Sequence, residues 1–185
     1  KREWIVRACK YDVTRGGTYA MTGPNGSGKS KLIQVIGGAI QHREGTISYK
    51  DKETTETPYR CLSFSAPYIE LIEEMTATEF MNFHSTFKPL IRPVYDILAE
   101  VGLEKAAHKQ IRYHSSGMKQ RLKLAQAFFT QAPVLLLDEP TTNLDADGIE
   151  LYRQLINNYT KEKLVIVSSN DKQEYDFCEE IIEIG

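Results

Sequence analysis

The 185-residue sequence predicts an α/β protein with a mostly parallel β-sheet. Short apolar segments typical of buried strands alternate along the chain with segments of helical spacing. A glycine-rich loop joins the first such strand to the first such helix within residues 18–36. A long helical block, about residues 67–131, interrupts this alternation. We therefore expect one domain with a core of residues 1–66 and 132–185 and an inserted helical subdomain at about 67–131.

The strand and helix segments follow one another in a regular order. Residues 4–13 have the pattern of a strand pair, which predicts a small antiparallel β portion at the N-terminus. Further strands are expected at 18–22, 45–49, 61–65, 134–137, 164–167 and 181–184, the last at an edge of the sheet, and a polar loop at 50–60. Helices are expected at 31–36, after the capping-box sequence 76–79, from Pro93 to near Gly102, at 116–130 and at 146–160.

Residues 23–30 read Gly-Pro-Asn-Gly-Ser-Gly-Lys-Ser, which matches the phosphate-binding pattern G-x-x-x-x-G-K-[ST]. Gly23 and Gly28 permit the tight backbone that brings N–H groups to phosphate oxygens. Lys29 supplies a cation for the β- and γ-phosphates, and the Ser30 hydroxyl can bind Mg²⁺. The residues expected to contact the nucleotide are Gly23, Pro24, Asn25, Gly26, Ser27, Gly28, Lys29, Ser30 and Lys31. The loop predicts a P-loop NTPase core that binds ATP with Mg²⁺.

Two carboxylates follow directly on the apolar run 134–137. Side chains at the carboxyl end of a parallel strand project into the crevice where ligands bind. Asp138 can hold Mg²⁺ beside the phosphates, and Glu139 can orient or deprotonate the attacking water. The alternative is that these residues only terminate a strand. The phosphate loop upstream favours the metal and catalytic roles.

Residues 113–121 read Tyr-His-Ser-Ser-Gly-Met-Lys-Gln-Arg and resemble the signature motif of ABC-type ATPases, usually Leu-Ser-Gly-Gly-Gln followed by Gln-Arg. The matching positions are Ser115, Gly117, Gln120 and Arg121, and the departures are Ser116 and Met118. A serine hydroxyl and backbone N–H groups at a helix N-terminus form an anion site. Taken alone, however, the segment favours an ordinary Ser-Ser helix cap.

The order of the motifs strengthens this resemblance, which covers nearly the whole chain. Residues 141–145 read Thr-Thr-Asn-Leu-Asp and look like the family's D-loop, with Asp145 at its aspartate. The resemblance implies an ATP-binding subunit of an ABC transporter that hydrolyses ATP in a head-to-tail dimer with a second copy or a homologous subunit. Ser115 and Gly117 would then contact ATP held by the partner. It also implies a separate transmembrane permease subunit and a cytoplasmic, peripheral location on the inner face of the membrane.

Besides Ser116 and Met118, two functional positions of the chain depart from the family pattern. Ser65 or Ala66 stands where the family has a glutamine that reaches the metal, and Asn170 stands at the switch histidine. Asn170 can donate a hydrogen bond to a γ-phosphate but cannot carry a charge. These replacements predict slow hydrolysis. Trp4 is the candidate for stacking on adenine, although it could equally belong to the core.

The composition limits the remaining classes of function. The net charge is −2 and the pI about 6.1, which gives no attraction to nucleic acid. No apolar run approaches the roughly 20 residues needed to cross a bilayer. By the same resemblance, residues 67–72 with Phe80, Phe83 and Phe87 would receive the membrane subunit, and the alternative is that they fill the helical subdomain. A regulatory nucleotide sensor and a soluble ABC-type ATPase outside transport remain the alternative functions.

Overall fold

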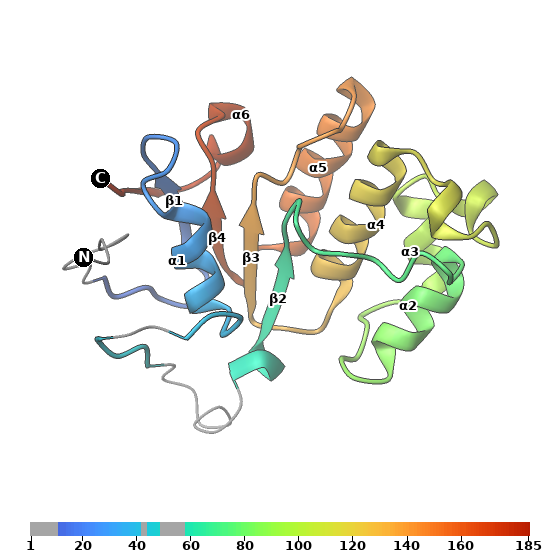
Figure 1. The fold of residues 1–185 in the computed structure, drawn as a ribbon, viewed down its shortest axis with the longest axis horizontal. Helices are drawn as coiled ribbons and strands as arrows, with labels where there is room; N and C mark the ends of the chain where they lie inside the picture. The colour runs from blue at the N-terminus through green and yellow to red at the C-terminus, as the bar shows by residue number, and fades with distance from the viewer. Residues whose placement is uncertain (1–10, 42–43, 49–57) are drawn as a thin grey trace.

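The computed structural model describes residues 11–41, 44–48 and 58–185. Within these residues, five parallel strands form one sheet in the order β2-β3-β4-β1-β5 (Figure 1). The strands are β1 (Thr18–Thr22), β2 (Leu62–Ser65), β3 (Val134–Asp138), β4 (Leu164–Ser168) and β5 (Glu180–Glu183). The predicted α/β class is confirmed, and β5 lies at an edge of the sheet as expected.

The helices lie on both faces of the sheet and beyond the β2 edge (Figure 1). They are α1 (Lys29–Ile36), α2 (Ala77–Ser85), α3 (Val94–Glu100), α4 (Ser116–Phe129), α5 (Ala146–Tyr159) and α6 (Lys172–Tyr175), with short 3₁₀ helices η1 (Pro58–Cys61), η2 (Glu104–Ala106) and η3 (Ile111–Tyr113). The predicted capping box opens α2. Thr76 Oγ1 accepts from the Glu79 N–H at 3.2 Å, and the Glu79 carboxylate accepts from the Thr76 N–H at 2.8 Å. Pro93 precedes α3 as its N-cap.

Two hydrophobic layers cover the sheet. Successive residues of a strand point to opposite faces, so the apolar run of β3 divides between the layers. Leu135 and Leu137 join a large cluster with α2, α3, α4 and α5, whereas Leu136 joins a smaller one with Ile33 of α1. All three leucines are fully buried. The expectation that both faces of this strand are covered is therefore confirmed.

Several sequence predictions need correction or remain open. Residues 46–48 of the expected strand 45–49 form no strand, because the whole stretch 44–48 is exposed and has no core to cover. The 3₁₀ helix η1 interrupts the expected loop 50–60, and β2 begins one residue later than predicted. The N-terminal antiparallel pair falls mostly on residues 4–10, outside the described residues. The division into a core and a helical subdomain stays a prediction, since one hydrophobic cluster runs through both parts.

A histidine of α2 is held in a partly buried hydrogen-bond network. Gln126 Nε2 donates to His84 Nδ1 at 2.9 Å. His84 Nε2 lies 2.8 Å from Thr130 Oγ1, whose own hydrogen is donated to the Gln126 carbonyl at 2.6 Å. Protonation of Nδ1 would set two donors against each other. Burial, with a contribution from the positive charge of Lys88, lowers the pKa of His84 from 6.5 to about 4.

This histidine gives an expected pH dependence of stability. Below about pH 6.5 the unfolded chain takes up a proton that folded His84 refuses until about pH 4, so the free energy of unfolding falls as the pH falls through this window. Because the group is partly exposed, we expect a loss of about 1 kcal/mol by pH ~5. Urea titrations at pH ~7.5 and ~5 should show a smaller loss in His84→Gln than in wild type. The exposed His108 supplies the control variant His108→Gln, and equal losses in all three proteins would contradict the assignment.

Candidate functional site

The carboxyl ends of the central strands meet at one edge of the sheet. Strand register places Asp138 beside Ser168 of β4, and Ser168 beside Met21 of β1. The ladder continues just past the strands, where the Glu139 N–H donates to the Ser168 carbonyl at 2.9 Å and the Ser169 N–H donates to the Met21 carbonyl at 3.1 Å. The loops that follow β1, β3 and β4 therefore start at the same level, as predicted for a ligand-binding edge.

The phosphate loop folds around the side chain of Lys29. This side chain is buried, and its Nζ donates to the carbonyls of Gly23 at 2.7 Å and Pro24 at 3.2 Å. The Ser27 N–H donates to the Pro24 carbonyl at 3.1 Å. The loop is thus closed by its own lysine, which lies where its charge can act on an anion seated on the loop.

Gly23 and Gly28 are required by the backbone, as the motif predicts. Gly23 has φ +143°, and a Cβ there would lie 2.0 Å from the carbonyl oxygen of Ile184, just after β5. Gly28 has φ +99° and is the N-cap of α1. No side chain caps this end of the helix, so the N–H groups of its first turn remain available to a ligand. Ser30 is the second residue of this helix.

Asn170 reaches the phosphate loop from the segment after β4. Its Oδ1 accepts from the Gly23 N–H at 3.2 Å, and its Nδ2 donates to Asn25 Oδ1 at 3.1 Å. The amide thus braces both ends of the turn 23–25. The structure brings this predicted site residue to the loop, and an amide can turn its N–H toward a phosphate that replaces Asn25 as acceptor.

The two carboxylates after β3 differ in environment. Asp138 is buried, whereas Glu139 is exposed and has φ +42°, an unfavourable backbone conformation for a residue with a side chain. Glu139 is therefore turned away from the strand path that Asp138 follows. Such strain at a ligand edge is typical of functional positions.

Buried polar atoms without a hydrogen-bond partner gather at this edge. In the described part of the chain they include Ser27 Oγ, Ser65 Oγ, Asp138 Oδ1 and Ser168 Oγ. These four residues belong to the phosphate loop and to the ends of β2, β3 and β4. Buried polar atoms are normally satisfied, so this cluster indicates a polar ligand or ion. Ser65 and Ala66, the residues at the expected glutamine position, are both fully buried.

The signature-like residues form the start of α4. Ser115 is its N-cap, and the Ser115 Oγ accepts from the Met118 N–H at 3.2 Å. This confirms the helix cap that the sequence left open as an alternative. Ser115 is exposed, so its hydroxyl also remains accessible. A Cβ on Gly117 would lie 3.1 Å from the Asn143 carbonyl, so the helix start lies close to the loop after β3.

Two further side chains join α4 to this loop. Gln120 Nε2 donates to the Pro140 carbonyl at 2.7 Å in a buried contact, and Arg121 Nη2 lies 3.2 Å from Asp145 Oδ1. Asp145 is also the N-cap of α5 and accepts from the Gly148 N–H at 2.9 Å. That N–H, followed by Arg121, lowers the pKa of Asp145. Asp145 therefore has a structural role in its own subunit besides the predicted contact with nucleotide.

The buried carboxylate of Glu174 was not predicted from the sequence. It accepts hydrogen bonds from the Thr141 N–H at 2.7 Å and from the Thr141 hydroxyl. Burial raises its pKa, against the hydrogen bonds from Ser169 and Thr141. Glu174 links α6 to the loop after β3. Only its position four residues after Asn170 could have suggested this, because its partner lies far away in sequence.

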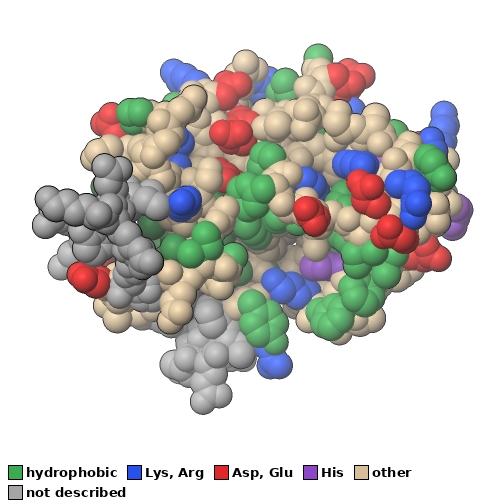
Figure 2. Space-filling view, in the orientation of Figure 1, with side chains coloured by type: hydrophobic (Ala, Val, Ile, Leu, Met, Phe, Trp, Pro, Cys, Tyr) green, Lys and Arg blue, Asp and Glu red, His purple; other side chains and the backbone are tan. Residues whose placement is uncertain are grey.

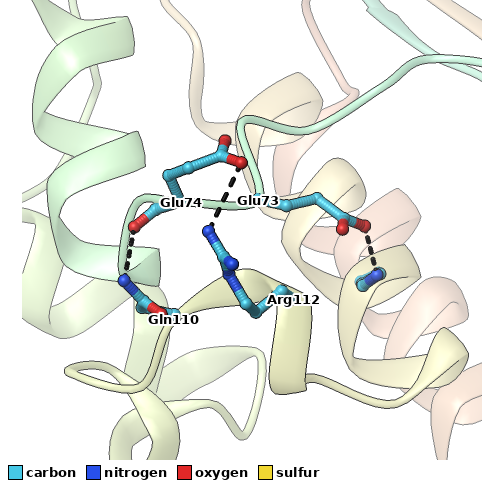
Figure 3. Close-up of polar contacts among 5 residues, drawn as sticks. Glu73, Glu74, Gln110 and Arg112 are labelled. Atoms are coloured by element: carbon cyan, nitrogen blue, oxygen red, sulfur yellow. Dashed lines mark hydrogen bonds and ion pairs between the residues drawn. The ribbon is translucent and has the colours of Figure 1, made fainter.

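The segment before α2 is bound to the residues that lead into α4. Gln110 Nε2 donates to the Glu74 carbonyl at 3.1 Å, and Arg112 Nη2 lies 3.3 Å from Glu74 Oε1. Lys119 of α4 forms an ion pair with Glu73 (Figure 3). Backbone hydrogen bonds from the Ile111 N–H to the Met75 carbonyl at 2.9 Å and from the Arg112 N–H to the Glu73 carbonyl at 3.0 Å reinforce the pairing.

Trp4, the predicted candidate for stacking on adenine, lies outside the described residues.

Comparison with known proteins places this site in a family. Residues 6–142 match the model of a family described as ABC transporter. The chain belongs to the ABC transporter family. The chain is 30% identical over 183 residues, or 96% of its length, to the uncharacterized ABC transporter ATP-binding protein YxlF of Bacillus subtilis (strain 168). It spans 61% of the length of that relative. It is 28% identical over 167 residues to the lantibiotic transport ATP-binding protein SrtF of Streptococcus pyogenes, covering 90% of the chain and 73% of SrtF.

Solved structures resemble this ABC family chain over almost its whole length. The ATP-binding cassette MJ0796, in a dimeric post-hydrolysis state bound to ADP and Pi, has a TM-score of 0.84 at 24% identity and covers 97% of the chain and 86% of its own. An ATP-binding subunit of an ABC transporter has a TM-score of 0.82 at 25% identity and covers 97% and 79%. The likeness confirms the fold. No helix in the described part of the chain is long and apolar enough to cross a membrane.

Gly23 and Gly26 of the loop differ in a way that can be measured. In Gly23→Ala the new Cβ would meet backbone at 2.0 Å, whereas Gly26 has φ +86° with nothing within 4 Å. Gly26→Ala should lower the free energy of unfolding by about 1 kcal/mol through its backbone conformation alone. Gly23→Ala should cost at least ~2 kcal/mol more, because β5 has to move. Urea unfolding without nucleotide checks this, and equal costs would contradict the close approach.

Proposed function

We propose that the chain is the ATP-binding and ATP-hydrolysing subunit of an ABC transporter. The observation that carries this proposal is the closed phosphate loop beside unsatisfied buried polar atoms at the ends of β2, β3 and β4. A polyphosphate with its metal ion supplies acceptors for the loop N–H groups and a cation for the carboxylate. Membership of the family and the names of its relatives support the same function.

Ser30 and Asp138 are the residues that would hold Mg²⁺. The donor set fits, because a hydroxyl and a carboxylate are oxygen ligands and Asp138 Oδ1 is buried without a partner. The ion would neutralise charge on the phosphates. The chain's own contribution is to fix this carboxylate at the end of β3, level with the phosphate loop.

Hydrolysis is assigned to Glu139, Lys29 and Asn170. Glu139 is exposed at the site edge, where its carboxylate can orient or deprotonate a water molecule. Lys29 stabilises the developing charge on the phosphate. The Asn170 amide is a neutral donor and cannot replace the charge of the histidine expected at this position. The loss of one contact that stabilises charge in the transition state typically costs about 2.7–4 kcal/mol. We therefore propose slow turnover.

The active form is proposed to be a head-to-tail dimer. Ser115 begins α4, whereas Lys29 begins α1, and these helices lie on opposite sides of β3 (Figure 1). The exposed Ser115 hydroxyl and the backbone at Gly117 form a second anion site that faces outward. A second copy would bring this site to the phosphate loop of the first. The dimeric state named for MJ0796 supports this arrangement.

A permease subunit at the cytoplasmic face of a membrane is the proposed partner. Phe83 and Phe87 pack edge to face with ring centroids 5.1 Å apart, and 44% and 67% of their surfaces are exposed. Hydrophobic side chains gather over the part of the molecule where α2 lies (Figure 2). Phe80 is buried, so this residue fills the helical layer instead. An exposed aromatic pair at the C-terminal end of a helix suits contact with an apolar segment of another protein.

A regulatory nucleotide sensor is the second candidate function. The neutral Asn170 amide, bonded within the phosphate loop rather than left free, favours it. In a sensor, nucleotide binding would drive dimer formation and hydrolysis would be incidental. The rate of turnover distinguishes the two functions.

Steady-state ATP turnover with Mg²⁺ tests the assignment of Glu139. Glu139→Gln should lower the turnover rate about 100-fold or more, because the amide cannot accept a proton from water. Nucleotide affinity should stay within a few-fold of wild type. Glu104→Gln, at an exposed carboxylate on η2, is the matched control and should leave both values unchanged. If wild type and Glu139→Gln bind ATP and are equally inactive, the chain is no ATPase.

A further inference from the structure

The chain turns sharply after β2. The Ile69 N–H donates to the Ala66 carbonyl at 3.2 Å, which closes a turn over residues 66–69. The turn directs Tyr68 back toward the strand, where its ring centroid lies 6.1 Å from that of Phe64. The phenol is therefore held near the end of β2, beside β3 in the sheet.

A lysine of α4 holds this turn in place. Lys123 Nζ donates to the Pro67 carbonyl at 2.6 Å and lies 3.4 Å from the Ala66 carbonyl. Partial burial lowers the pKa of Lys123, with repulsion from Lys119 as a smaller cause. An ammonium placed there is costly unless acceptors surround it, and the two carbonyls supply them. The turn is thus fastened to the helix whose N-cap is Ser115.

A second attachment lies a few residues further on. Lys119, one helical turn before Lys123, pairs with Glu73, and Arg112 pairs with Glu74 (Figure 3). Residues 66–74 are therefore bound to α4 and to its approach at both ends. Any movement of the α4 N-terminus would be passed to the turn that carries Tyr68.

The Tyr68 ring lies against the face of the sheet to which the Asp138 side chain points. Phe64, which contacts the Tyr68 ring, packs against the cluster that contains Leu136. Asp138 follows Leu136 by two residues in β3, so both side chains point to this face. Burial raises the pKa of Tyr68, hydrogen bonding with Gln34 of α1 lowers it, and the Asp138 carboxylate raises it. Both groups are thus close enough to interact with the phenol. It can donate to a carboxylate oxygen while it accepts from an amide. Asp138 otherwise lacks hydrogen-bond donors, since its Oδ1 has no partner in the described structure.

We propose that Tyr68 is a positioning residue for Asp138, and that Lys123 holds Tyr68 in place from α4. The hydroxyl would orient the carboxylate for Mg²⁺ and tie the phosphate site of one subunit to the helix that begins at its Ser115. The inference rests on the proposed function, because it takes Asp138 as the metal-binding carboxylate. Ala66, at the expected glutamine position, has no polar side chain that could take this part.

Calorimetric titration with ADP, with and without Mg²⁺, tests the proposal without relying on turnover. Tyr68→Phe keeps the ring and its contact with Phe64 but removes the hydroxyl. The gain in ADP affinity that Mg²⁺ confers should shrink about threefold to tenfold, the worth of one hydrogen bond to a charged group. Affinity without Mg²⁺ should not change. Tyr95→Phe on α3, where 74% of the residue is exposed, should behave as wild type.

The lysine provides a second pair of variants. Lys123→Met should reduce the Mg²⁺ gain like Tyr68→Phe, and Lys123→Arg should restore it by binding the same carbonyls. An unchanged gain in Tyr68→Phe would overturn this inference alone. A wild-type chain that fails to bind ADP would overturn the proposed function, so the two failures are distinguishable.

Discussion

The hydrogen-bonded register of β3, β4 and β1 is the constraint on which the candidate site depends. It sets Asp138, Ser168 and Met21 side by side, so that three loops leave the sheet at one level. Each loop then adds a different group: a phosphate cradle, a pair of carboxylates and an amide. A slip of one residue would turn Asp138 to the opposite face of the sheet and separate it from the phosphate loop. The burial of both faces of β3 makes such a slip costly.

Helix α4 is the second element that organises the molecule. Along its first two turns it contacts three separate segments: Gln120 and Arg121 reach the loop after β3, Lys119 reaches the stretch before α2, and Lys123 reaches the turn after β2. Each contact is worth only about 1 kcal/mol. Together they connect the exposed Ser115 end of the helix to the segments that surround Asp138.

Sequence analysis succeeded where the signal is local. The phosphate loop, the cap of α2 and the acidic pair after an apolar strand are contiguous patterns with fixed backbone requirements. The prediction of a strand at 45–49 was wrong for residues 46–48, because residues 44–48 are exposed and β-propensity alone does not form a strand. Glu174 and the role of Tyr68 were out of reach, because each depends on a partner distant in the chain. The roles assigned to individual site residues remain predictions.

The central claim is that one nucleotide is held by the phosphate loop of one copy and the Ser115 segment of another. Mixing two inactive variants tests it directly, with Lys29→Ala disabling the phosphate loop and Ser115→Phe blocking the α4 N-terminus. Each variant alone should show no ATP turnover, because every dimer lacks one half of each site. The mixture should regain up to about a quarter of the wild-type rate, since mixed dimers contain one complete site. A mixture as inactive as its two components would contradict the shared site.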